Sequence, residues 1–190
     1  MNEALEKRLN QVFPKLVSDE FLTGKGLGNE LGFYIFDYPP EEELRMREFL
    51  KELTEQISRK RPDIKVCHTD LFEFVLDYLR DRDVLEKSIE MQKAKGNESL
   101  KKALSGVLHE SKLGPIFAEK TKPNAYDIIL LSGVGSAFPL LRSHTLLNNL
   151  QPVVDKPLVI FYPGKYDHQT LRLFGKIKSA GYYRAFKLIS

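Results

Sequence analysis

The sequence of 190 residues contains one cysteine, Cys67, and no tryptophan. A single cysteine excludes an internal disulfide and a zinc site built from several cysteines, and it fits a reducing compartment. No stretch approaches the roughly 20 consecutive apolar residues of a membrane-spanning helix, and the first residues lack the apolar core of a signal peptide. We therefore expect a cytoplasmic protein that contacts no membrane.

A strong excess of charge of one sign is also missing. The 29 basic and 26 acidic residues give a net charge of +3, too small to indicate nucleic-acid binding from composition alone. The pI of about 8.8 still permits a local basic face. With 42% hydrophobic and 29% charged residues, the composition is typical of a folded globular protein, and we expect a single domain over residues 1–190.

Motifs for nucleotide hydrolysis and for metal binding are absent from the sequence. A P-loop requires Gly-x-x-x-x-Gly-Lys-Ser/Thr between a strand and a helix. The first predicted strand instead runs into Tyr38-Pro39-Pro40-Glu41. Gly133-Val134-Gly135 lacks the third glycine of the dinucleotide motif, and the histidines show no spacing of metal ligands. We expect neither a cofactor nor a metal.

Short apolar runs alternate along the chain with helical patterns. The runs predict strands at 33–38, 64–68, 126–133, 157–164 and 183–189. Apolar spacing predicts helices at 2–17, 41–57, 140–154 and 170–179, and a helix that begins at residue 71. Residues 81–122 show only helical patterns and predict a helical insertion. We expect an α/β fold with one open, mainly parallel sheet of about five strands, Rossmann-like or P-loop-like without a P-loop, and an N-terminal helix.

Ligands of such sheets bind at the carboxyl ends of the strands. The polar and glycine residues predicted at these ends form a candidate strand-end pocket: Asp37, His68, Asp70, Ser132, Gly133 and Gly135. Because His68 and Asp70 alternate on one strand, they could act as a base and its orienting carboxylate. The alternative, which we favour, is that Asp70 caps the following helix.

Basic residues and tyrosines are interleaved near the C-terminus. The basic residues there include Lys165, Arg172, Lys176, Lys178, Arg184 and Lys187, and the tyrosines are Tyr162, Tyr166, Tyr182 and Tyr183. Such a segment could hold a phosphate backbone or form a protein interface, and the small net charge favours the interface. The glycine-rich stretch Gly24–Gly28 precedes the first strand, which favours a structured turn or partner-binding loop over a phosphate loop.

Several blocks of the sequence, in the right order, resemble the BrxB family, the small B component of the BREX bacteriophage-exclusion defence systems. The blocks are Gly26-Leu27-Gly28-Asn29-Glu30 with Phe33–Tyr38, His144–Asn148, Leu158–Asp167, Leu171–Gly175 and Tyr182–Phe186. The resemblance runs from about residue 21 to the C-terminus, and the helical insertion contributes little to it.

The resemblance implies a subunit needed for phage restriction, encoded beside the phosphatase-like protein PglZ, an AAA+ ATPase and a DNA methyltransferase, with no established enzymatic activity. It supplies no catalytic residues. Together with the missing catalytic motifs, it leads us to expect a non-catalytic adaptor that docks PglZ, with the ATPase and other BREX components as further candidate partners. The alternatives are a nucleic-acid-binding module of the same complex that uses the basic C-terminal segment, with DNA as its partner, and, less favoured, a cryptic nucleotide-binding or hydrolytic domain. The candidate partner-binding residues are Gly26, Gly28, Asn29, Glu30, Tyr162, Lys165, Tyr166, Arg172, Tyr182, Tyr183 and Arg184.

Overall fold

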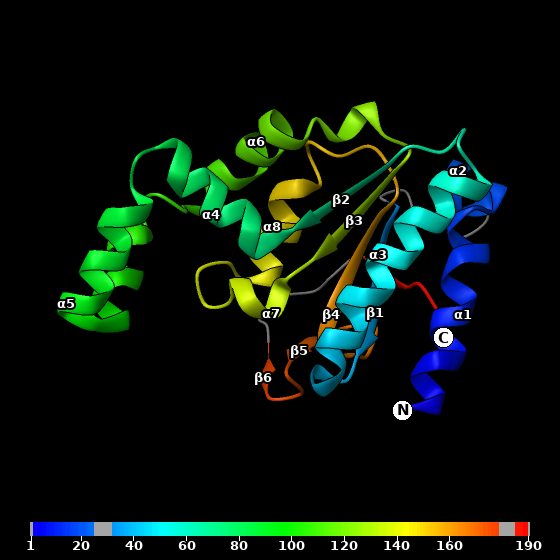
Figure 1. Cartoon of the computed structure of the whole chain (residues 1–190), viewed down its shortest axis with the longest axis horizontal. Helices are drawn as coiled ribbons and strands as arrows, with labels where there is room; N and C mark the ends of the chain where they lie inside the picture. The colour runs from blue at the N-terminus through cyan, green and yellow to red at the C-terminus, as the bar shows by residue number, and fades with distance from the viewer. Residues whose placement is uncertain (1, 25–31, 179–184, 190) are drawn as a thin grey trace.

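The computed structural model describes residues 2–24, 32–178 and 185–189, in which helices and strands alternate (Figure 1). The helices are α1 (Glu3–Leu16), α2 (Asp19–Thr23), α3 (Glu43–Lys60), α4 (Leu71–Asp81), α5 (Leu85–Leu104), α6 (Glu110–Thr121), α7 (Val134–Ala137) and α8 (Ser143–Leu150), with 3-10 turns η1 (Pro40–Glu42) and η2 (Pro123–Ala125). The strands are β1 (Phe33–Tyr38), β2 (Val66–Asp70), β3 (Ile128–Ser132), β4 (Leu158–Tyr166), β5 (Leu171–Leu173), β6 (Ile177–Lys178) and β7 (Phe186–Lys187). The expected fold class, α/β with an open, mainly parallel sheet, is confirmed.

The strands of the main sheet lie in the order β2-β3-β4-β1-β7, and each neighbouring pair is parallel. Strand β1 is an interior strand, since it pairs with β4 on one side and with β7 on the other. Strand β7 ends the order and is therefore an edge strand of the sheet. Beyond the parallel part, β4 continues into an antiparallel extension with β5 and β6.

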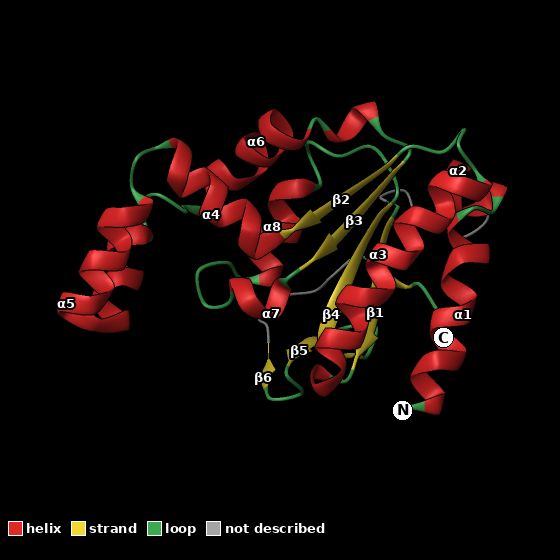
Figure 2. Ribbon diagram, in the orientation of Figure 1, coloured by secondary structure: helices red, strands yellow, loops and turns green. Residues whose placement is uncertain are grey.

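Helices cover both faces of the sheet (Figure 2). Alternate side chains of a strand point to opposite faces, so Phe33 and Ile35 join the core under α4–α8 while Tyr34 and Phe36 join the core under α1–α3. Strands β1, β3 and β4 are buried almost throughout, as expected for parallel strands covered on both sides. The result is a layer of sheet between two layers of helices.

The expected helical insertion, residues 81–122, contains α5 and α6. Helix α5 is interrupted at Gly96, whose φ of 77° and ψ of 177° are not helical. Leu85 near one end and Leu100 and Leu104 near the other pack on the core, while the residues around Gly96 are exposed. Helix α5 is therefore a helical hairpin that stands away from the sheet, at the far left of Figure 1. Within the described ranges, no helix combines the length and apolar content needed to cross a bilayer.

The predicted helix at 170–179 is wrong. Residues 171–173 and 177–178 form β5 and β6, which fold back on β4. The pattern of β5 has period two, because Leu171 and Leu173 are buried and Arg172 is exposed. Glycine at position 164 permits the close pairing, since a Cβ there would lie 2.1 Å from the carbonyl oxygen of Arg172.

Candidate functional site

The topological switch point of the sheet lies at the carboxyl ends of β1 and β4. These strands are neighbours, but the chain leaves β1 through α3 on one face and leaves β4 through β5, whose leucines pack with the core of the opposite face. In open α/β sheets such a divergence creates the crevice where ligands bind. The groups at this position therefore decide whether the crevice can hold a ligand.

Asp37 fills the switch point with bonds to the protein itself. One carboxylate oxygen accepts a hydrogen bond from Arg8 of α1 at 2.8 Å, and the other accepts one from the backbone N–H of Tyr166 at 3.0 Å. Lys187 of β7 lies 3.6 Å from the second oxygen. Arg8 also donates to the carbonyl oxygen of Asp37 at 2.7 Å. Asp37 therefore connects α1, β4 and β7 to β1, and Arg8 and Lys187 match its charge.

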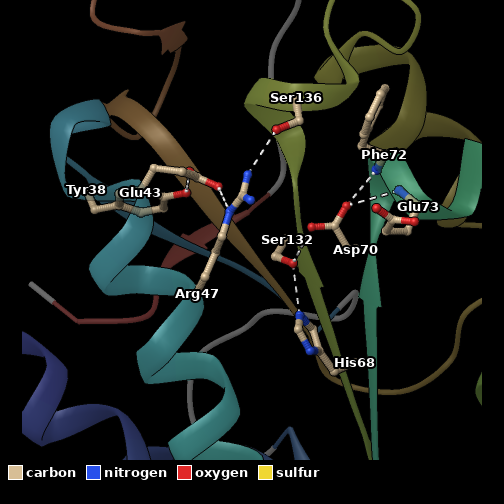
Figure 3. A network of polar contacts seen from close by, with 9 residues as sticks. All are labelled: Tyr38, Glu43, Arg47, His68, Asp70, Phe72, Glu73, Ser132 and Ser136. Carbon is tan, nitrogen blue, oxygen red and sulfur yellow. Dashed lines mark hydrogen bonds and ion pairs between the residues drawn. The ribbon is translucent and has the colours of Figure 1, made fainter.

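A second cluster of polar side chains, His68, Asp70 and Ser132, lies at the carboxyl ends of β2 and β3 (Figure 3). The parallel register places Asp70 beside Ser132. The Ser132 hydroxyl is 2.9 Å from Nε2 of His68 and 3.5 Å from Oδ2 of Asp70. The other Asp70 oxygen accepts hydrogen bonds from the backbone N–H groups of Phe72 and Glu73 at 2.9 and 3.2 Å. Asp70 is therefore the N-cap of α4, the role that the sequence favoured.

The order of groups in this second cluster differs from that of a catalytic triad. In a triad the carboxylate orients the imidazole, whereas here Asp70 contacts the serine and the helix N-terminus. Ser132 is only 7% exposed. Desolvation lowers the pKa of His68 below its ordinary value, and the charge of Asp70 partly opposes this shift. His68 therefore favours its neutral form, which can accept a hydrogen bond from the Ser132 hydroxyl or donate one to it, according to its tautomer.

The two glycines of the predicted strand-end pocket make room for neighbouring side chains. Gly133 has a φ of 71°, and a Cβ there would lie 2.2 Å from Oδ1 of Asp70. A Cβ on Gly135 would lie 3.0 Å from the ring of Phe174. These glycines thus allow β3 and α7 to approach the cap of α4 and the β4–β5 extension.

A chain of polar contacts next to this cluster was not predicted from the sequence (Figure 3). The Tyr38 hydroxyl donates to Glu43 at 2.6 Å, and Arg47 donates to Glu43 at 3.1 Å and to Ser136 of α7 at 3.2 Å. Burial and the hydrogen bond to Glu43 raise the pKa of Tyr38. The i, i+4 spacing of Glu43 and Arg47 just after a strand was the available signal. These polar contacts join the carboxyl end of β1 to the segment that follows β3.

A pocket of about 300 Å³ lies at the base of the α5 hairpin. Its apolar lining comes from Leu104, Leu108, Leu113, Leu140 and Leu141. Lys101 and Arg142 supply exposed basic groups at its rim, and no described residue that lines it is acidic. The lining comes from α5, α6 and the segment before α8, so the helical insertion contributes to an accessible concave surface.

The candidate partner-binding residues fall into three groups. Lys165 and Arg172 are exposed. Tyr162 and Tyr166 are only 0% and 2% exposed, so the prediction that they belong to a partner-binding surface is wrong. The two residues are four positions apart in β4, so their side chains point to the same face of the sheet, where both join the core. The Tyr166 hydroxyl donates to the carbonyl oxygen of Ala185 at 2.6 Å. The remaining candidates lie outside the described residues: Gly26, Gly28, Asn29, Glu30, Tyr182, Tyr183 and Arg184.

In the part of the chain that the structure describes, no group of three or more His, Cys, Asp or Glu side chains is placed to hold a metal ion. Cys67 is half-buried, and its burial raises the pKa of the thiol. The described residues that gather at the strand ends are thus Asp37 on one side and His68, Asp70 and Ser132 on the other.

The fold and these sites define a parallel α/β protein whose switch point is filled by its own ion pairs. The family model for BREX protein BrxB matches residues 67–188. The chain is 41% identical to a BREX protein BrxB of Bacillus cereus (strain H3081.97), over 97% of both chains. It is 38% identical to a BREX protein BrxB of Escherichia coli O9:H4 (strain HS), over 100% of this chain and 94% of the relative. No solved structure matches significantly. The chain belongs to the BrxB family and is a component of a BREX defence system.

Proposed function

We propose that the chain is a non-catalytic adaptor of its BREX system, which docks PglZ and brings it together with other components such as the AAA+ ATPase. The observation that carries the proposal is the engagement of Asp37 with Arg8, Lys187 and the backbone of Tyr166. A carboxylate with these partners stabilises the fold at the position where related sheets hold a ligand. A scaffold of this kind serves recognition through its outer surface.

The second cluster supports the same proposal. Asp70 uses one oxygen to cap α4, and Ser132 is almost fully buried between strand ends. A hydrolytic site needs an accessible nucleophile next to a base that a third group orients. The contacts of Asp70 favour a role in joining β2, β3 and α4.

We assign the docking of PglZ to the pocket at the base of the α5 hairpin. Its leucines provide an apolar floor, and its basic rim complements an acidic partner segment that carries an apolar side chain. An accessible apolar pocket with a polar rim is the usual form of an interaction hot spot. The occupant is therefore an acidic, partly apolar segment of PglZ.

Size-exclusion chromatography of the purified proteins tests the adaptor role. The wild-type chain should co-elute with PglZ at low and moderate salt, and separation at both would contradict the proposal. The variant Lys101→Glu/Arg142→Glu reverses the rim charges and should weaken binding by about tenfold or more. The control Lys93→Glu/Lys95→Glu makes the same change of charge near the exposed tip of the hairpin and should bind as wild type. Equal binding by both variants would place the docking surface elsewhere.

A further inference from the structure

Three basic side chains lie side by side on the antiparallel extension of the sheet. Lys165 of β4 pairs with Arg172 of β5, and Arg172 pairs with Lys178 of β6. Residues directly opposite each other in antiparallel strands point to the same face. All three are exposed, whereas their neighbours Leu171 and Leu173 in β5 are buried on the other face. We call Lys165, Arg172 and Lys178 the cationic row.

The charges of the cationic row are not matched within the described part of the chain, where none of the three forms an ion pair. The nearest acidic residue in sequence, Asp167, accepts hydrogen bonds from the N–H groups of Gln169 and Thr170 and from the Thr170 hydroxyl. These bonds, more than the charge of Arg172, lower the pKa of Asp167 to about 2. Like charges directly opposite each other destabilise a sheet. The row is therefore an arrangement that an external anion would stabilise.

The composition of this face indicates the kind of anion. The centre of a protein interface is apolar and depleted of charge. In β6 the exposed apolar residue is Ile177, which pairs with Leu173 and so points away from the row. Neighbouring strands lie about 4.8 Å apart, so the row extends over about 10 Å. Phe174, 38% exposed in the turn after β5, has its ring beside Gly135 of α7, so the three paired positions of the row are all cationic. A line of cations at the strand spacing suits the regularly spaced charges of a phosphodiester chain.

We propose that the cationic row binds the phosphate backbone of a nucleic acid. Binding through phosphates is independent of sequence and falls steeply with salt, because it releases condensed counterions. The inference concerns a surface separate from the α5 pocket and does not depend on the docking of PglZ.

Fluorescence anisotropy with labelled DNA of about 20 nucleotides, single-stranded and duplex, tests the proposal. The chain should bind at least one form at about 50 mM salt and lose affinity by about 200 mM. The variant Lys165→Gln/Arg172→Gln/Lys178→Gln should lose about tenfold or more in affinity for all sequences alike. Its slope of log affinity against log salt should be smaller by about 3, one for each phosphate contact.

A matched variant separates the row from the general charge of the protein. Lys87→Gln/Lys93→Gln/Lys95→Gln removes the same charge from the exposed part of α5 and should leave both the affinity and the salt slope unchanged. The proposal is overturned by no DNA binding at about 50 mM salt, or by equal losses in the two variants. It is also overturned if polyglutamate of the same charge concentration displaces the DNA, because the row would then prefer an acidic polypeptide.

Thermal unfolding of the same variants gives a second readout. Because neutralisation removes repulsion between opposed cations, the row variant should melt at or above the temperature of the wild type. A clear decrease in melting temperature would show that the three side chains stabilise the hairpin, and the row would then be structural.

Discussion

The two halves of the carboxyl edge of the sheet use their acidic residues differently. At the ends of β1 and β4, Asp37 accepts hydrogen bonds from Arg8 and Tyr166 and lies beside Lys187. At the ends of β2 and β3, Asp70 caps α4 and contacts Ser132, whose hydroxyl also lies 2.9 Å from Nε2 of His68. The first half holds a charge matched by cations, whereas the second holds neutral donors and a carboxylate satisfied by N–H groups.

The difference shows which carboxylate stabilises the whole fold and which stabilises one helix. A carboxylate bound by groups from α1, β4 and β7 depends on long-range contacts and stabilises the assembled chain. Asp70 acts on the helix that begins at the next residue, so its contribution is local. The same edge of the sheet thus contains Asp37, which links distant elements, and Asp70, which caps one helix. Substitutions at the two sites should therefore lower the stability of the fold by different amounts.

The largest expected effect comes from Asp37→Asn. This change keeps the shape of the side chain but leaves Arg8 and Lys187 without their counter-charge. Removing one member of a largely buried ion pair leaves the charge of its partners uncompensated. We therefore expect a loss of about 3–4 kcal/mol in the free energy of unfolding, measured by urea denaturation. Glu86→Gln removes an exposed carboxylate and should stay within about 0.5 kcal/mol of wild type. A similarly small change for Asp37→Asn would remove the distinction between the two halves.

The next effect concerns the glycine that contacts the local cap. Gly133 and Gly175 have φ values of 71° and 70°, but a Cβ would meet Asp70 at Gly133 and nothing within 4 Å at Gly175. Gly175→Ala should therefore cost about 1 kcal/mol from backbone strain alone. Gly133→Ala adds displacement of the cap and should cost about 2–3 kcal/mol in the same denaturation measurement. Equal losses would show that Asp70 moves aside without penalty.

The smallest effect is a pH dependence from His68. Because desolvation lowers its pKa in the folded state, the unfolded chain binds the proton more readily. The contribution to stability is present above the ordinary histidine pKa of about 6.5 and is lost as the pH falls through the folded pKa. Urea denaturation between about pH 7.5 and pH 5.5 should show a smaller loss in His68→Gln than in wild type.

His168→Gln provides the control for this titration, because His168 lies in the exposed turn between β4 and β5. Between about pH 7.5 and pH 5.5, the His168→Gln variant should lose as much stability as the wild type, because His68 is still present. The prediction is contradicted if His68→Gln and wild type lose stability in parallel, or if NMR titration gives His68 a pKa above the ordinary value.

The fold class could be predicted because its signals are local. The buried runs of β1, β3 and β4 read as strands, and a helical pattern follows each of the first strands. The cap formed by Asp70 was accessible for the same reason, since it binds residues two and three positions further on.

The contacts of Asp37 could not be read from the sequence, because Arg8 is 29 residues away and Tyr166 is 129 residues away. The β5–β6 hairpin was missed since its strands have only three and two residues, too short for period two to outweigh a helical pattern. Reading this segment as a helix also hid the cationic row, which exists only through the strand register.

The interior position of β1, between β4 and β7, has a consequence for how the chain can be divided. The region matched by the family model begins at residue 67, after β1, α1 and α3. A fragment limited to that region would leave β7 without its partner and open a hydrogen-bonding edge on β4 at the middle of the sheet. The segment that the family model matches therefore lacks an interior strand of the sheet, and we expect a fragment without the N-terminal third of the sequence not to fold.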